Sequence, residues 1–133
     1  MRKLYLPLVL SVFLSACATK GSAPYLTSEP LAKPDSVSNY WVSTNNVQPL
    51  KYLTYEQKES CTEQNITVKA KYLIDSNGDV FNVQILEANT DAVIQRLVEK
   101  SLQQRDFQPS KSNTTLQPVI AHSKLEMKCE ERV

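Results

Sequence analysis

Three cysteines and one histidine are the side chains in this sequence best suited to bind zinc and similar metals, and a cysteine can also act as a nucleophile. The sequence contains no Cys-x-x-Cys spacing, and His122 is its single histidine, so the closely spaced ligand pairs of the common zinc sites are missing. A catalytic site would also need an acid/base pair placed beside a nucleophile, and no such constellation is recognisable. The sequence therefore predicts a protein that is not an enzyme, with no metal, no cofactor and no small-molecule substrate.

The first cysteine, Cys17, follows a short segment with the features of an export signal. Arg2 and Lys3 form a basic start, residues 4–13 form an apolar run too short to span a bilayer as a helix, and Leu14-Ser15-Ala16 comes next. This arrangement resembles the signal of a bacterial lipoprotein. The resemblance implies cleavage before the cysteine, a diacylglycerol on its sulfur and a fatty acyl chain such as palmitate on its amino group.

Two other interpretations of this segment are open at the level of sequence. A soluble-secretion signal would leave Cys17 as an ordinary thiol, and an uncleaved anchor is disfavoured because Pro7 interrupts the apolar run. Lipidation would keep the protein on a membrane, because each buried CH₂ group contributes ~0.8 kcal/mol and more than one chain holds stably. Ala18 and Thr19 lack the aspartate that favours inner-membrane retention in enteric bacteria. We therefore expect an outer-membrane protein that faces the periplasm.

The remaining cysteines, Cys61 and Cys129, form an even pair in a protein expected to be exported. Because such compartments permit disulfides, we expect the two cysteines to be joined. A disulfide that closes a loop of roughly 68 residues would contribute about 4 kcal/mol through the entropy of the unfolded chain. A redox-active or metal-binding pair is the alternative, which the cysteine spacing supports poorly.

The charge balance indicates which partners the protein does not bind. The full sequence has 15 basic and 14 acidic residues, and loss of Arg2 and Lys3 with the signal leaves 13 basic residues and a formal charge of −1. Nucleic acids and anionic surfaces favour strongly basic proteins. We therefore expect no nucleic-acid partner.

Two neighbouring strands are predicted in the middle of the chain. In residues 66–74 the even-numbered positions are apolar and alternate with polar ones, as a half-buried strand requires, and only Leu73 breaks the alternation. Residues 80–86 form the second strand, with three apolar side chains expected on one face: Phe81, Val83 and Ile85.

The five residues between these strands, 75–79, read Asp-Ser-Asn-Gly-Asp. The Asn77-Gly78 pair tolerates positive φ and is typical of a hairpin turn. Oxygens of Asp75, Asn77 and Asp79 could coordinate Ca²⁺, but the spacing breaks the EF-hand pattern and no glutamate follows at its twelfth position. The sequence therefore favours turn chemistry over a calcium site.

A helix is predicted after the second strand. Asn89-Thr90-Asp91 offers N-cap oxygens, and Pro109 ends the helical pattern. Between them, residues at helical spacing form one buried stripe: Val93, Ile94, Leu97, Val98, Ser101 and Leu102. The helix should cover one face of the hairpin.

A third strand is predicted near the end of the chain. Apolar Val119, Ala121, Leu125 and Met127 alternate there with polar residues. After the helix the chain runs back, so this strand should pair antiparallel with the first strand. The predicted fold is α+β, ββαβ: a small antiparallel three-stranded sheet in the order 2-1-3 with one helix on one face. This topology places Cys61 and Cys129 at the same end of the sheet.

Residues 17–48 contain the lipidated cysteine and a stretch rich in Ser, Thr and Asn, which predicts a flexible tether before a domain at 49–133. As a coil the tether would span on the order of 30 Å. Tyr40 and Trp41 concentrate apolar surface within it. They are expected either to dock on the domain or to contact a partner.

The region from Tyr55 through the third predicted strand resembles the carboxy-terminal domain of TonB, the periplasmic end of an energy transducer in Gram-negative bacteria. The resemblance rests on the alternating strand ending in Ile74-Asp75, the turn glycine Gly78, and a second strand and helix that lead to Phe107-Gln108-Pro109. It covers about 75 residues. Arg105 replaces the tryptophan that many members carry before the aromatic-x-Pro. The resemblance implies the fold more firmly than the function.

The resemblance also implies a binding mode, in which an extended receptor peptide adds to an edge of the sheet. The third strand should be such an edge, so the candidate partner-binding residues are Val119, Ala121, Ser123, Leu125 and Met127, together with Tyr40 and Trp41. We expect an adaptor that binds an envelope protein. The alternatives are a structural accessory lipoprotein of an envelope complex, or a TonB-like component of receptor-linked transport.

Overall fold

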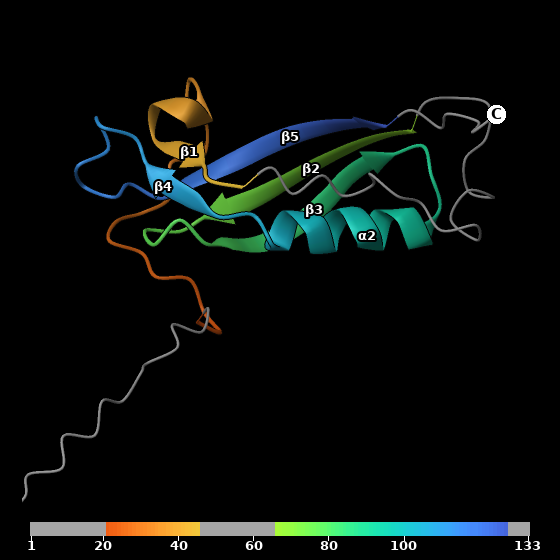
Figure 1. Ribbon diagram of the computed structural model, residues 1–133, viewed down its shortest axis with the longest axis horizontal. Coiled ribbons are helices and arrows are strands. Elements are labelled where there is room, and N and C mark those ends of the chain that lie inside the picture. The colour runs from red at the N-terminus through yellow and green to blue at the C-terminus, as the bar shows by residue number, and fades with distance from the viewer. Residues whose placement is uncertain (1–20, 46–65, 128–133) are drawn as a thin grey trace, which may run out of the picture.

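The computed structural model describes residues 21–45 and 66–127. The described elements in chain order are the 3₁₀ helix η1 (Val37–Asn39), the strands β1 (Trp41–Ser43), β2 (Ile66–Ile74) and β3 (Val80–Ala88), the helix α2 (Ala92–Gln103), and the strands β4 (Phe107–Pro109) and β5 (Val119–Met127). Figure 1 shows the three long strands side by side with α2 lying along them.

β2 is the central strand of the main sheet, whose order is β3-β2-β5 with both neighbours antiparallel. This order confirms the predicted 2-1-3 arrangement. The pairing of β2 with β5 runs without a shift from Ile66 opposite Met127 to Ile74 opposite Val119. The predicted alternation of β2 is also confirmed, because its even-numbered residues are all buried: Ile66, Val68, Ala70, Tyr72 and Ile74.

β3 departs from the predicted alternation. Its register with β2 shifts twice, and Asn82, in the part of β3 near one shift, has a φ of 52°. Phe81 lies opposite Leu73, whereas Ile85 lies opposite Ala70 on the core face. The prediction that Phe81 shares a face with the other apolar residues of this strand is therefore wrong, because a bulge inserts one residue and reverses the alternation.

The turn of residues 75–79 is organised by Asp75, which is 1% exposed. One carboxylate oxygen accepts the N–H groups of Asn77 at 2.9 Å and Asp79 at 3.0 Å. The other oxygen accepts the N–H of Tyr25 at 2.9 Å. These contacts confirm that the aspartate stabilises a turn, as the sequence favoured.

Gly78 completes this turn with a φ of 82°, a conformation that favours glycine. A side chain at this position would collide with the carbonyl group of Phe107 in β4. The N–H of Phe107 donates to the carbonyl of Gly78 at 3.0 Å. The turn therefore packs directly on β4.

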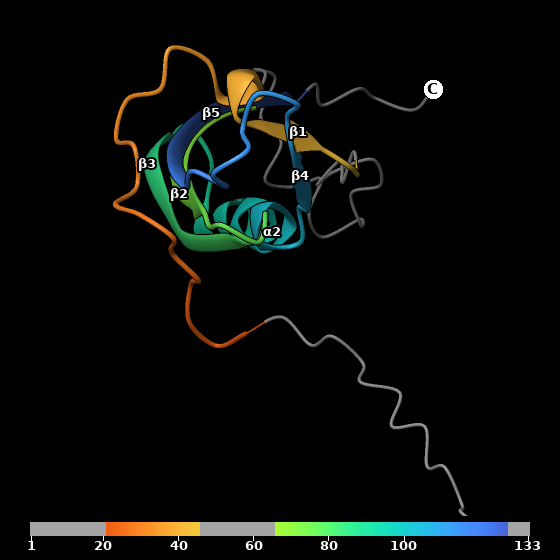
Figure 2. The ribbon, with the colours of Figure 1, turned by 90° about the vertical axis from the view of Figure 1, so that its left-hand side faces the viewer.

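α2 begins at the predicted cap. The carboxylate of Asp91 accepts the N–H groups of Val93 and Ile94, both at 3.1 Å. Part of the predicted stripe is buried, namely Ile94, Val98, Ser101 and Leu102, whereas Val93 is 51% exposed. Figure 2 shows α2 inside the curve of the sheet, so the opposite face of the sheet points outward.

Residues 25–45 lie against the domain, which corrects the expected flexible tether for its described part. Leu31 bridges Val119, and β1 pairs antiparallel with β4. Burial of the large apolar surface of Trp41, which is 2% exposed, offsets the entropy lost in ordering this segment. We call residues 25–36 the strap, and Figure 2 shows the chain before η1 passing along the outside of the sheet. The predicted boundaries at residues 16 and 48 lie outside the described residues.

Candidate functional site

The main sheet has two edges that differ in regularity. β3 forms one edge and carries both register shifts. Bulges disturb the row of backbone groups that an added strand would need. β5 forms the other edge and pairs with β2 without a shift. The β5 edge is therefore the better template for an additional strand.

The strap shows which backbone groups of β5 point outward. The N–H of Leu31 donates to the carbonyl of Pro118, and the N–H of Ile120 donates to the carbonyl of Leu31, both at 2.9 Å. Along an antiparallel strand, the N–H and C=O groups of successive residues point alternately to one neighbouring strand and to the other side. The next residues that face outward are His122, Lys124 and Glu126.

We call residues 122–126 of β5 the open edge. Within the described ranges, no backbone hydrogen bond joins their outward groups to another segment. The strap pairs with β5 only around Leu31, which lies between Pro30 and, three residues later, Pro34. Because proline has no N–H to donate, these two residues limit how far the strap can extend as a paired strand.

The residues of β5 that were predicted to bind a partner are the odd-numbered ones, whose backbone N–H and C=O groups point toward β2. Val119 and Ala121 are 0% and 1% exposed and form part of the core. Ser123, Leu125 and Met127 are half-buried, and Ser123 Oγ lies 3.0 Å from Tyr72 Oη. β5 is the edge strand that the sequence predicted, but its odd-numbered residues direct their backbone groups toward β2. The choice of Val119 and Ala121 as partner-binding residues is therefore wrong.

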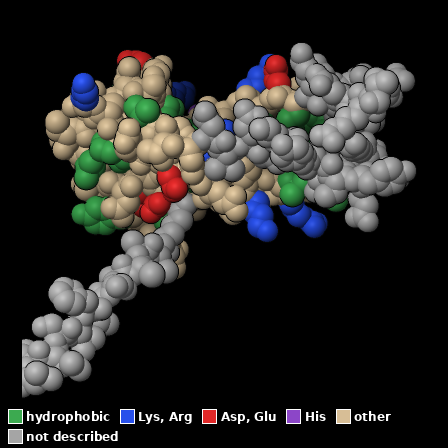
Figure 3. Space-filling view, in the orientation of Figure 1, with side chains coloured by type: hydrophobic (Ala, Val, Ile, Leu, Met, Phe, Trp, Pro, Cys, Tyr) green, Lys and Arg blue, Asp and Glu red, His purple; other side chains and the backbone are tan. Residues whose placement is uncertain are grey.

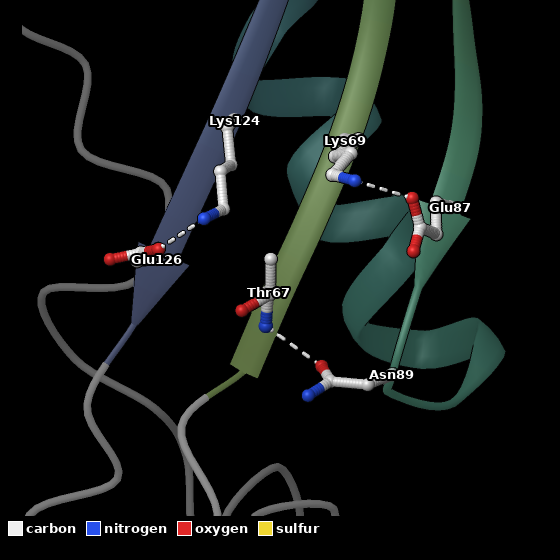
Figure 4. Close-up of polar contacts among 6 residues, drawn as sticks. All are labelled: Thr67, Lys69, Glu87, Asn89, Lys124 and Glu126. Carbon is white, nitrogen blue, oxygen red and sulfur yellow. Dashed lines mark hydrogen bonds and ion pairs between the residues drawn. The ribbon is translucent and has the colours of Figure 1, made fainter.

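Two ion pairs lie on the outer face of the sheet, one on β5 at the open edge and one between β2 and β3 (Figure 4). Lys124 Nζ lies 2.7 Å from Glu126 Oε1, and Lys69 Nζ lies 2.7 Å from Glu87 Oε2. The hydrogen bond from Lys69 lowers the pKa of Glu87, and that from Lys124 lowers the pKa of Glu126. The same bond raises the pKa of Lys124. All four side chains are exposed, so the pairs keep this face hydrated and add little stability.

Two further polar features lie on the outer face of the sheet or at its end. His122 is exposed, as predicted, and lies opposite Lys71 in the register. At the far end of the hairpin, the N–H of Thr67 donates to Asn89 Oδ1 at 2.7 Å (Figure 4). The outer face of β2 and β5 is therefore polar along most of its length.

Trp41 belongs to the buried core cluster, and Tyr40 packs against that cluster. Trp41 Nε1 donates to the carbonyl of Gln117 at 2.8 Å. The prediction that Trp41 contacts a partner is wrong, because its side chain is buried in the core, and docking on the domain is confirmed. Tyr40 is half-buried beside an open hollow of about 880 Å³ between the strap and the loop of residues 112–117.

The covalent predictions concern residues that the structure does not describe. Cys17, Cys61 and Cys129 all lie outside residues 21–45 and 66–127, so lipidation and the disulfide stay predictions. Among the described side chains, no group of three or more His, Cys, Asp or Glu residues could hold a metal ion. Over the same residues, no helix has the length and apolar character needed to cross a membrane.

The strand order, the helix within the curve of the sheet and the short strand β4 after that helix together define the architecture. The solution NMR structure of the Pseudomonas aeruginosa TonB CTD matches with a TM-score of 0.58 and 22% sequence identity, over 80% of this chain and 100% of that chain. No protein-family model and no curated protein match the sequence. The likeness establishes the TonB-like fold.

Proposed function

We propose that this protein is a lipid-anchored, non-catalytic adaptor that binds an extended segment of an envelope protein along the open edge of β5. The observation that carries the proposal is the unshifted pairing of β5 with β2, which leaves a regular row of outward backbone groups after Ile120. Strand addition to such an edge is a recurrent mode of peptide recognition. The TonB-like fold supports the proposal, because strand addition is the mode that the sequence resemblance implied.

The side chains along the open edge define the kind of segment that fits. Main-chain hydrogen bonds supply affinity in strand addition, and alternate side chains supply specificity. One face of an added strand would lie beside half-buried Leu125 and Met127, and the other beside exposed His122 and Lys124. The partner segment should therefore alternate apolar and polar residues.

The anchor and the compartment are part of the same proposal. The signal segment supports acylation of Cys17 and a position on the outer membrane, facing the periplasm. An intact mass measurement tests both covalent predictions. We expect added diacylglycerol and fatty acyl groups on Cys17 and a deficit of two hydrogens for the Cys61 and Cys129 pair.

The structure favours the open edge over an accessory role through the outer face of the sheet. That face is charged and hydrated, and the Tyr40 and Trp41 segment, which an accessory role could also have used for contact, is docked on the domain. A role in receptor-linked transport depends on the identity of the partner. The photocrosslinking experiment described next would reveal the identity of that partner.

Photocrosslinking in intact cells tests the proposed edge. A photoreactive phenylalanine analogue replaces His122, so that an added strand would be captured and identified. Lys124→Pro then removes one outward N–H, a change that edge strands tolerate because that group takes no part in the β2 ladder. We expect Lys124→Pro to abolish capture.

Lys124→Ala is the matched control, because it removes the same side chain and keeps the N–H. It should retain capture of the same partner. Fluorescence of buried Trp41 and far-UV circular dichroism check that each variant is folded. Undiminished capture by Lys124→Pro, or equal loss in Lys124→Ala, would contradict main-chain pairing at this edge.

A further inference from the structure

The strap is fixed to the domain at the end of the sheet that carries the 75–79 turn. The N–H of Tyr25 donates to Asp75 at 2.9 Å, and the carbonyl of Tyr25 accepts the N–H of Ser76 at 2.8 Å. The N–H of Thr27 donates to Ser76 Oγ at 3.0 Å. The backbone is therefore held at Tyr25, and any anchor that precedes it pulls on this end of the domain.

The length of chain between Cys17 and this attachment is short. Tyr25 is the eighth residue after Cys17. Eight residues span at most about 29 Å when fully extended and about 16 Å as a flexible coil. β2 alone has nine residues, which corresponds to a sheet roughly 30 Å long. Because the chain between Cys17 and Tyr25 is shorter than the sheet, it would hold the end of the sheet that carries the 75–79 turn, which we call the turn end, close to the bilayer.

Two adjacent large side chains at this attachment are exposed. Tyr25 is 55% exposed and Leu26 is 44% exposed. From Gly21 to Ala32 the only charged residue is Glu29. Figure 3 shows hydrophobic side chains at the surface of this end of the molecule, together with basic side chains at its top and acidic side chains low on it, while further Lys and Arg side chains lie on the lower surface of the opposite half. A tyrosine beside an aliphatic residue suits the boundary between headgroups and acyl chains.

We propose that Tyr25 and Leu26 enter the interface of the bilayer that holds Cys17, so that the domain stands on the membrane by its turn end. This inference rests on the lipid anchor of the proposed function. The open edge then begins about 10 Å from that end of β5 at His122 and runs away from the lipid to about 23 Å at Glu126. Because the contact is apolar, it should depend little on salt or on anionic lipid.

Tryptophan quenching by lipid tests this orientation on the full-length acylated protein. The protein is reconstituted in phosphatidylcholine vesicles whose acyl chains are brominated, since bromine quenches tryptophan at close approach. Trp41 is 2% exposed, so its fluorescence should be quenched little and serves as a constant background. Leu26→Trp places a reporter at the proposed contact. Leu86→Trp is the matched control, because Leu86 is 54% exposed in the half of β3 away from the turn.

We expect Leu26→Trp to be quenched several-fold more than Leu86→Trp, with a blue-shifted emission that persists at high salt. Equal quenching of the two variants, with the acyl groups confirmed by mass, would overturn the orientation and leave the anchor intact. Quenching that requires anionic lipid and disappears at high salt would overturn the apolar contact. A mass without acyl groups would overturn the anchor itself, and with it this inference.

Discussion

Replacing Trp41 with alanine tests whether the segment before β2 belongs to the folded domain. Trp41 is 2% exposed, packs in the core and donates to the carbonyl of Gln117 at 2.8 Å. Truncation of a buried tryptophan costs about 3–5 kcal/mol, and a buried carbonyl left without its donor costs roughly 1 kcal/mol more. We expect Trp41→Ala to lower the free energy of unfolding by about 4–6 kcal/mol.

Equilibrium unfolding in urea measures this loss on the unlipidated Cys17→Ser chain, followed by far-UV circular dichroism. With a slope of about 1.5 kcal/mol/M for a domain of this size, the midpoint should fall by roughly 3–4 M. Such a loss is a large part of the stability of an ordinary domain, about 5–15 kcal/mol. If the free energy of unfolding of the parent protein lies at the low end of this range, the variant should be partly unfolded even without denaturant.

Val42→Ala provides the matched control, because Val42 is the next residue of β1 and is 43% exposed. Its effect should stay within about 0.5 kcal/mol, as for most surface substitutions. Equal and small shifts for Trp41→Ala and Val42→Ala would refute the reasoning. The segment would then be the free tether that its composition suggested.

Three further changes test the turn, the helix cap and the surface charges. Gly78→Ala should destabilise by about 3 kcal/mol in urea unfolding, since it combines positive φ with a backbone collision, whereas Gly21→Ala should be neutral. Asp91→Ala should cost about 1 kcal/mol and reduce helical circular dichroism at the melting midpoint. The pKa values of Glu87 and Glu126 are lowered in the folded protein, so both carboxylates add stability at pH values above the ordinary glutamate pKa. This stability is lost as the pH falls through the lowered pKa values. Because both are exposed, Glu87→Gln and Glu126→Gln should lower the Tm only slightly at neutral pH and not at all in strong acid.

The parts of the fold that the sequence predicted are those specified by local pattern. The alternation of residues 66–74 reports one buried face, and Asp91 satisfies backbone donors only two and three residues away. Asp75 likewise bonds within its own turn. Such signals need no knowledge of distant contacts.

The parts that the sequence missed depend on contacts between distant segments. Trp41 is ordered by β4 and by Gln117, which lies 76 residues later, so its polar neighbours in sequence suggested a tether. The bulge near Asn82 reverses the face of Phe81 without a glycine to mark it. The outward direction of the even-numbered β5 residues follows only from the bond to Leu31, which no local pattern contains.

Amide hydrogen exchange along β5 tests the central claim of an open edge most directly. In the unlipidated protein, NMR should show slow exchange for the N–H groups of Ser123 and Leu125, which bond to β2, and fast exchange for those of His122, Lys124 and Glu126. Protection of all five amides to the same degree would show that another segment already occupies this edge, and would contradict the proposed mode of binding.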